Sequence, residues 1–270
     1  MRRFLLTAGV CTFIVAVLTV VSVFHFENRE LIYTALSIFL FLTGSFILKL
    51  IAPKMSRKKF FKFQFIKNND FKLVIHMTVL VISGGFLLNL LMITLLELFG
   101  NTVPSNAFSQ FDTSNIWISL FTVALIPAVF EELFFRGAVL SSLSSDKTIM
   151  AAFVSSLFFS LVHGSLYYFL SNFFAGIVFT VMIYLTGSIF ASITAHLFNN
   201  ILSYILFVYS SRLMTVGFDN FVVWILVLIF LVALYNTLGA IAKKYKEELK
   251  LDRPLINEGE LIWEKRKGKE

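Results

Sequence analysis

The chain has 270 residues, of which 58% are hydrophobic and only 14% are charged. Ordinary soluble domains carry about 45 to 50% apolar and about 25% charged residues. The apolar residues here form blocks of about 18 or more, the length that crosses a hydrocarbon core, so a water-soluble fold is excluded. The formal net charge is +7, and the single cysteine, Cys11, rules out an intramolecular disulfide.

Eight apolar stretches predict eight transmembrane helices, and hence an all-α, polytopic helix bundle. In chain order they cover residues 5–24, 31–51, 73–99, 116–143, 148–165, 167–186, 189–210 and 220–241. The first stretch follows Arg2 and Arg3 and could be a signal sequence. Because Val23-Phe24-His25 makes a poor cleavage site and further spans follow, we interpret it as a membrane span.

The Lys and Arg residues divide unevenly between the connections. One set of connections carries Arg2, Arg3, Lys54, Arg57, Lys58, Lys59, Lys62, Lys67, Lys147 and the tail 243–250, while the opposite set carries Arg29 and Arg212. The positive-inside rule then predicts both termini in the cytoplasm, and an even number of spans agrees. We expect a multi-pass protein of the cell membrane.

The basic loop 54–72 interleaves Lys with Phe, a pattern typical of segments that lie at a membrane surface. Anionic lipid headgroups are the expected counter-ions, so membrane lipids are predicted partners and nucleic acid is not. The chain divides into residues 1–115 with three spans and this loop, a candidate catalytic core at 116–210, and a last span with a charged tail at 211–270. The oligomeric state is left open.

Ionisable side chains inside spans indicate function, because each costs at least about 2.5 to 3.5 kcal/mol on insertion scales unless it is paired or lines a wet cavity. The fourth span contains Glu131, Glu132 and Arg136. Glu132 and Arg136 are four residues apart on one helix face and can pair. Glu131 points about 100° away from Glu132, without a partner on its own helix, and is a candidate general base for a water molecule.

Two histidines lie in later spans, His163 in the fifth and His196, with Asn200 one turn further on, in the seventh. If spans four and five form an antiparallel hairpin, Glu131 and His163 each lie about 16 residues from Lys147 and therefore at a similar depth. They are predicted to meet. Counting from the turn at 187–188 places Asn200 nearer to this depth than His196.

A carboxylate and two imidazoles can activate water in two ways. Glu131 can take the proton directly, while His163, His196 and Asn200 hold the water or stabilise the oxyanion. Alternatively, Glu131, His163 and His196 can supply three ligands to a catalytic zinc. The sequence does not choose between these routes, so the cofactor stays open.

Other intramembrane protease chemistries are disfavoured by the motifs that the sequence lacks. All five aspartates fall in connections, which excludes a paired intramembrane aspartate dyad. The zinc signature H-E-x-x-H is also missing, and no G-x-S-x-G motif supports a serine nucleophile.

Three motifs within residues 116–210 resemble those of the CAAX protease and bacteriocin-processing family, also called the Abi family. They are Glu131-Glu132-x-x-x-Arg136, Phe159-x-x-x-His163 and His196-x-x-x-Asn200. The resemblance implies an intramembrane endopeptidase that hydrolyses a hydrophobic, membrane-associated or lipidated peptide. It implies that Glu131 activates the water with His163 as its partner, and that Glu132, Arg136, His196 and Asn200 complete the site. Family members are described both as metal enzymes and as glutamate-dependent proteases, and no particular substrate is transferred.

Two other classes of function use the same residues. A non-catalytic membrane scaffold or bacteriocin-immunity protein would retain the polar set as a helix-packing network. A proton-coupled transporter would use the buried acids, but the sequence shows no recognisable inverted halves. Complementation by Glu131→Gln and His163→Ala variants would favour the scaffold, and proton-dependent uptake into proteoliposomes would favour the transporter.

Overall fold

The computed structural model describes residues 2–24, 29–52, 56–100, 115–143, 148–209 and 221–251. Within these ranges all regular secondary structure is helical, which confirms the predicted all-α class. The lipid core offers no water to backbone N–H and C=O groups. Helices satisfy these groups within each segment, and the apolar sequence blocks therefore fold as a polytopic bundle.

Seven helical segments in the described part of the chain are long and apolar enough to cross a membrane. Six are single helices: α1 (Arg2–Val23), α2 (Arg29–Ile51), α4 (Phe71–Leu98), α9 (Phe169–Thr186), α10 (Ile189–Tyr209) and α11 (Phe221–Leu251). The seventh, Ile116–Leu143, is a continuous helical run whose winding changes along its length.

The fifth predicted span, 148–165, is shorter than the sequence pattern indicated. Its helix α8 (Thr148–Leu161) has 14 residues, which gives about 21 Å of helix against a hydrocarbon thickness of about 30 Å. Beyond Leu161 the chain turns, and Gly164 takes a left-handed conformation with φ 63°, which glycine adopts without steric cost. The prediction of eight full-length spans is corrected to seven and one shorter helix, because apolar residues continue through this turn.

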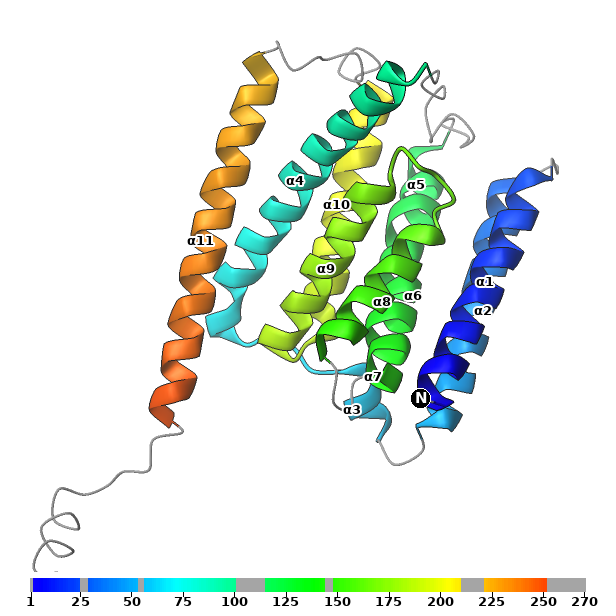
Figure 1. The fold of residues 1–270 in the computed structure, drawn as a ribbon, viewed down its shortest axis with the longest axis horizontal. Helices are drawn as coiled ribbons and strands as arrows, with labels where there is room; N and C mark the ends of the chain where they lie inside the picture. Colours follow the sequence, from blue (N-terminus) through cyan, green and yellow to red (C-terminus); the bar gives the residue numbers. More distant parts are fainter. Residues whose placement is uncertain are drawn as a thin grey trace, which may run out of the picture.

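The helices form a series of packed neighbours (Figure 1). α11 packs on α4, α4 on α9 and α10, and α8 on α9, while α1 and α2 pack on the other side of the Ile116–Leu143 run. α1 begins and α11 ends at the same end of the bundle, where the short helix α3 (Arg57–Phe61) also lies (Figure 1). This arrangement fits an even number of passes, and the cytoplasmic location of that end stays a prediction.

Polar and apolar side chains are distributed as a lipid solvent requires. Large apolar side chains such as Phe13, Phe46 and Leu228 are exposed on the outer helices, whereas the buried set includes many serines and threonines. Half of the most apolar window in the Ile116–Leu143 run and in α9 is buried, against 17% in α11. These two segments therefore form the protein-enclosed centre in which charged groups escape the lipid.

Candidate active site

The run Ile116–Leu143 carries its acidic residues between two stretches of wider, π-helical winding. It begins as α5 (Ile116–Ser119) and η2 (Leu120–Leu125), continues as α6 (Ile126–Glu132), and ends as η3 (Leu133–Val139) and α7 (Leu140–Leu143). Pro127 stands in the first turn of α6; it lacks an N–H, which removes one backbone hydrogen bond and favours a local change of winding. π-helical turns are rare and frequently mark functional sites.

Glu132 and Arg136 form the predicted ion pair inside the protein. Arg136 Nη1 donates to Glu132 Oε1 at 2.9 Å, and neither side chain has exposed surface. The guanidinium Cζ also lies 4.1 Å from the ring centroid of Phe159 on α8 and 5.3 Å from that of Phe179 on α9. Aromatic faces attract cations, so the carboxylate and the two rings together offset the cost of burying this charge.

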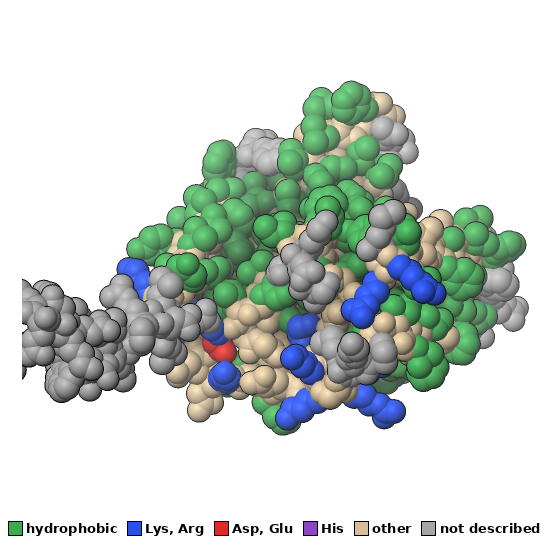
Figure 2. All heavy atoms as spheres, turned by 60° about the horizontal axis from the view of Figure 1, so that its bottom comes forward, with side chains coloured by type: hydrophobic (Ala, Val, Ile, Leu, Met, Phe, Trp, Pro, Cys, Tyr) green, Lys and Arg blue, Asp and Glu red, His purple; other side chains and the backbone are tan. Residues whose placement is uncertain are grey.

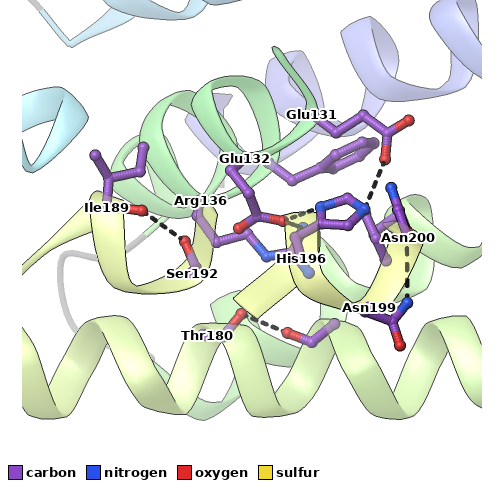
Figure 3. Close-up of polar contacts among 12 residues, drawn as sticks. Glu131, Glu132, Arg136, Thr180, Ile189, Ser192, His196, Asn199 and Asn200 are labelled. Atoms are coloured by element: carbon purple, nitrogen blue, oxygen red, sulfur yellow. Dashed lines mark hydrogen bonds and ion pairs between the residues drawn. The ribbon is translucent and has the colours of Figure 1, made fainter. Parts of the chain in front are cut away.

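His196 connects this ion pair to the second acid. Its Nδ1 lies 3.1 Å from Glu132 Oε1, and its Nε2 lies 3.9 Å from Glu131 Oε2. Figure 3 shows both glutamates of the run reaching toward the imidazole of α10. The ring is held between Phe159 at 5.5 Å and Phe179 at 5.3 Å, measured between ring centroids. His196 is therefore fixed by one hydrogen bond and two aromatic contacts.

Glu131 and His163 meet, as the hairpin estimate predicted. Glu131 Oε2 lies 3.9 Å from His163 Nε2, and the two side chains are 13% and 31% exposed. His163 follows the end of α8, where its Nδ1 lies 2.7 Å from the backbone carbonyl of Phe159. The depth estimate ranked Asn200 above His196, but the structure brings His196 to Glu131. The site thus has an accessible part at Glu131 and His163, beside a buried network.

The hydrogen-bond partners assign the tautomers of both histidines. A backbone carbonyl only accepts, so His163 Nδ1 carries the hydrogen that it shares with Phe159 O. An ionised Glu132 also only accepts, so His196 Nδ1 carries a hydrogen too. In the neutral rings, both Nε2 atoms then present lone pairs toward the Glu131 carboxylate. Its Oε2 is buried and has no hydrogen-bond partner among the described residues.

Three converging acceptor atoms suit a water molecule that donates hydrogens, or a cation. Zinc with three such ligands at about 2.0 to 2.2 Å holds neighbouring donor atoms about 3.3 to 3.5 Å apart. Here Glu131 Oε2 is 3.9 Å from each Nε2, and no three His, Cys, Asp or Glu side chains in the described ranges have metal-binding geometry. The predicted zinc set of Glu131, His163 and His196 is therefore about 0.5 Å wider than a bound zinc would hold it, a spacing that a bridging water also spans.

Asn200 lies one turn beyond His196 on α10 (Figure 3). Its Nδ2 donates at 3.4 Å to the carbonyl of Val123 in η2, and its Oδ1 accepts from Asn199 at 3.4 Å. The amide is half-buried and links α10 to the wide turn that precedes α6.

Sequence reasoning missed two residues of this network. Phe179 forms a wall against both His196 and Arg136, and Ser155 Oγ donates to the carbonyl of Phe135 in η3 at 2.9 Å. Phe179 is one of 33 phenylalanines in the chain, and no local pattern separates it from those that face lipid. Ser155 could be suspected as a polar residue in an apolar helix, but its acceptor depends on the fold.

The residues gathered here define a membrane-embedded site of acids and imidazoles. Residues 113–202 match the family model described as type II CAAX prenyl endopeptidase Rce1-like. These 90 residues are one third of the chain and include all six predicted site residues. Over this part of the chain, the match confirms the resemblance to the CAAX protease family. Neither the comparison with curated proteins nor that with solved structures gave a match.

Proposed function

We propose that this protein is an intramembrane endopeptidase in which Glu131 activates the attacking water. The observation that carries the proposal is the convergence of Glu131 Oε2 and the Nε2 atoms of His163 and His196. The family match supports the protease class, and the assignment of roles to these residues is our inference from the geometry.

The proposed reaction begins with a water molecule that donates one hydrogen to Glu131 Oε2 and one to an imidazole Nε2. As its oxygen attacks the carbonyl carbon of the peptide, a proton passes to Glu131 and the carbonyl oxygen becomes an oxyanion. The Asn200 amide is the proposed donor to that oxyanion. Glu131 then returns the proton to the leaving nitrogen, and the C–N bond breaks. One water is consumed, and a carboxylic acid and an amine leave.

Glu132 and Arg136 act in this scheme as positioning residues. Their ion pair is fully buried, and Glu132 Oε1 holds His196 Nδ1 at 3.1 Å. The bond fixes the ring orientation, so that the other ring nitrogen faces the water. Burial in a low dielectric also strengthens each of these electrostatic contacts.

The proposed substrate is a hydrophobic, membrane-associated or lipidated peptide. The site lies among helices whose outer faces are apolar. A hydrophobic or lipidated peptide dissolved in the bilayer can therefore reach the site more easily than a polar peptide dissolved in water. The family description names prenyl endopeptidases, and a prenylated peptide is one member of the proposed class.

The decisive experiment compares membrane-fraction peptides from cells that carry the native chain, Glu131→Gln or Glu97→Gln. Glu97 is exposed near the end of α4, so its substitution makes the same chemical change outside the site. We expect new peptide termini with the native chain and Glu97→Gln, and their loss with Glu131→Gln at equal protein level. The same termini in all three samples would refute the proposal, and full biological complementation by Glu131→Gln would favour a scaffold or immunity protein.

Direct activation by Glu131 also predicts the effect of metal removal. Cleavage by purified protein should persist when a membrane-permeant zinc chelator is present, because no proposed step passes through a metal. Loss of cleavage that added zinc restores would assign the reaction to the zinc route instead.

A further inference from the structure

Residues 56–67, which we call the basic clasp, follow α2 and reach across the end of the bundle. Ser56 caps α3 by accepting from Lys59 N, and Lys62 ends α3 in a left-handed conformation with φ 53°. The side chain of Phe60, within this segment, is fully buried. The clasp is therefore a defined structure anchored to the protein.

Three residues of the clasp, Phe60, Lys62 and Gln64, offer backbone carbonyls to two helical segments of the site. One segment is the run that carries Glu131 and Glu132, and the other is α10, which carries His196. Phe60 O accepts from Ser141 Oγ at 2.7 Å, on the run that carries both acids. Lys62 O accepts from the backbone N–H of Ile189 at 3.1 Å, and Gln64 O accepts from Ser188 Oγ. These contacts tie α7 to the start of α10.

The tied positions are close to the buried network along each helix. Ser141 follows Arg136 by five residues, and Ile189 precedes His196 by seven, which is about 7.5 Å and about 10.5 Å of helix. A shift of the clasp therefore moves the helix carrying Glu132 relative to the helix carrying His196. Their 3.1 Å contact is sensitive to such a shift.

The outer face of the clasp is cationic and aromatic. Arg57, Lys58, Lys59 and Lys67 are exposed, and among the described residues no carboxylate pairs with them. Figure 2 shows Lys and Arg side chains gathered over this end of the molecule. Phe65 is 81% exposed and stacks on Phe190 of α10 at 5.3 Å. Exposed cations beside exposed aromatic rings are the chemistry that recognises an anionic membrane surface.

We propose that the basic clasp binds the anionic phospholipid headgroups of the leaflet it faces. This binding keeps the helix that carries Glu132 and the helix that carries His196 at the relative position that their contact requires. The second half rests on the proposed peptidase function; the first does not. The clasp lies at the end of the bundle and beside apolar outer helices, so headgroups are the anions nearest to it. An acidic protein segment is the competing occupant that the experiment must exclude.

Headgroup binding is tested by amide hydrogen exchange on the full chain in nanodiscs. Discs of phosphatidylcholine are compared with discs that also contain 30% phosphatidylglycerol. We expect slower exchange across residues 57–67 in the anionic discs. Equal exchange in both discs would overturn the proposal, as would equal protection by soluble polyglutamate added to the neutral discs.

The matched variants remove three charges each. Arg57→Gln/Lys58→Gln/Lys59→Gln should lower the affinity for the anionic lipid roughly a hundredfold, since each cation near the surface contributes about a factor of five. Arg2→Gln/Arg3→Gln/Lys246→Gln removes the same charge outside the clasp. We expect protection of 57–67 to be lost in the first variant and kept in the second. Equal loss in both would show a diffuse charge effect and refute a site at the clasp.

The coupling to the active site is tested with Ser141→Ala/Ser188→Ala, which keeps all the cations. It removes three hydrogen bonds of the clasp: Ser141 Oγ to Phe60 O, Lys62 Nζ to Ser141 Oγ, and Ser188 Oγ to Gln64 O. The native protein should cleave several-fold faster in anionic than in neutral discs. The double variant should keep lipid-dependent protection and lose this dependence of cleavage. Native cleavage at equal rates in both discs would overturn the coupling while leaving the lipid site intact. If neither the native chain nor the double variant cleaves the substrate in either disc, that result would count against the proposed peptidase function and not against the lipid site.

Discussion

The buried pair of Glu132 and Arg136 predicts that removing one partner costs much more stability than replacing both. Arg136→Met leaves the Glu132 carboxylate without exposed surface and with His196 as its remaining hydrogen-bond partner. Breaking a buried ion pair costs about 3 to 5 kcal/mol, whereas replacing both members by neutral groups is often neutral. We expect Arg136→Met to lower the free energy of unfolding by about 3 to 5 kcal/mol. Glu132→Gln/Arg136→Met should recover at least about 2 kcal/mol of this loss.

The assay is reversible unfolding in mixed micelles, followed by circular dichroism, for the native chain, both single variants and the double variant. The coupling free energy follows from the four values. A double variant whose loss equals the sum of the two single losses would refute the reasoning. The peptidase rate is a separate readout. We expect the double variant to cleave more slowly than the native chain even though its stability is recovered, because a neutral amide at position 132 holds His196 Nδ1 less firmly than a carboxylate does.

Three further predictions concern packing, a backbone acceptor and a buried amine. Gly176→Ala would place a Cβ 2.8 Å from Ser156 Cβ, so the free energy of unfolding, measured by thermal unfolding, should fall by about 1 to 3 kcal/mol. The control Gly85→Ala meets nothing nearer than 4.0 Å and should be tolerated. Equal losses in the two variants would contradict the close contact at Gly176. Ser155→Ala leaves a carbonyl of η3 without its side-chain donor and should cost about 1 to 3 kcal/mol in the same assay, whereas an unchanged midpoint would show that the bond is dispensable. Burial lowers the pKa of Lys62 from 10.5 to about 8. Between these two pH values the unfolded chain binds more protons than the folded chain, so the free energy of unfolding should rise with pH. Lys62→Gln should flatten that rise, and identical pH profiles for the native chain and the variant would refute the role of Lys62.

The sequence predicted the parts of the site that depend on local spacing. The pairing of Glu132 with Arg136 follows from a separation of four residues on a helix. The meeting of Glu131 with His163 follows from equal distances to a hairpin turn. Both contacts are present in the structure, although Arg136 lies in the wider winding of η3 and His163 lies in the turn beyond α8. Short spacings along the chain were sufficient to predict them despite these departures from regular α-helical geometry.

Contacts between distant helices could not be predicted in this way. Depth counting favoured Asn200, yet His196 is the residue at Glu131, since the start and tilt of α10 depend on its neighbours. The end of α8 at Leu161 was missed because the apolar pattern runs on through a turn at Gly164. The winding of η3 likewise had no signal in the sequence.

By itself, the sequence determined that this chain crosses a lipid bilayer as helices and carries acids and imidazoles into it, because hydrophobic length and the cost of buried charge are local properties. The tertiary structure decided which of these groups converge at Glu131, which aromatic rings surround Arg136, and how residues 56–67 join the two helices of the site. These features depend on the packing of segments far apart in the chain, where distances are set by interlocking side chains instead of by the period of a helix.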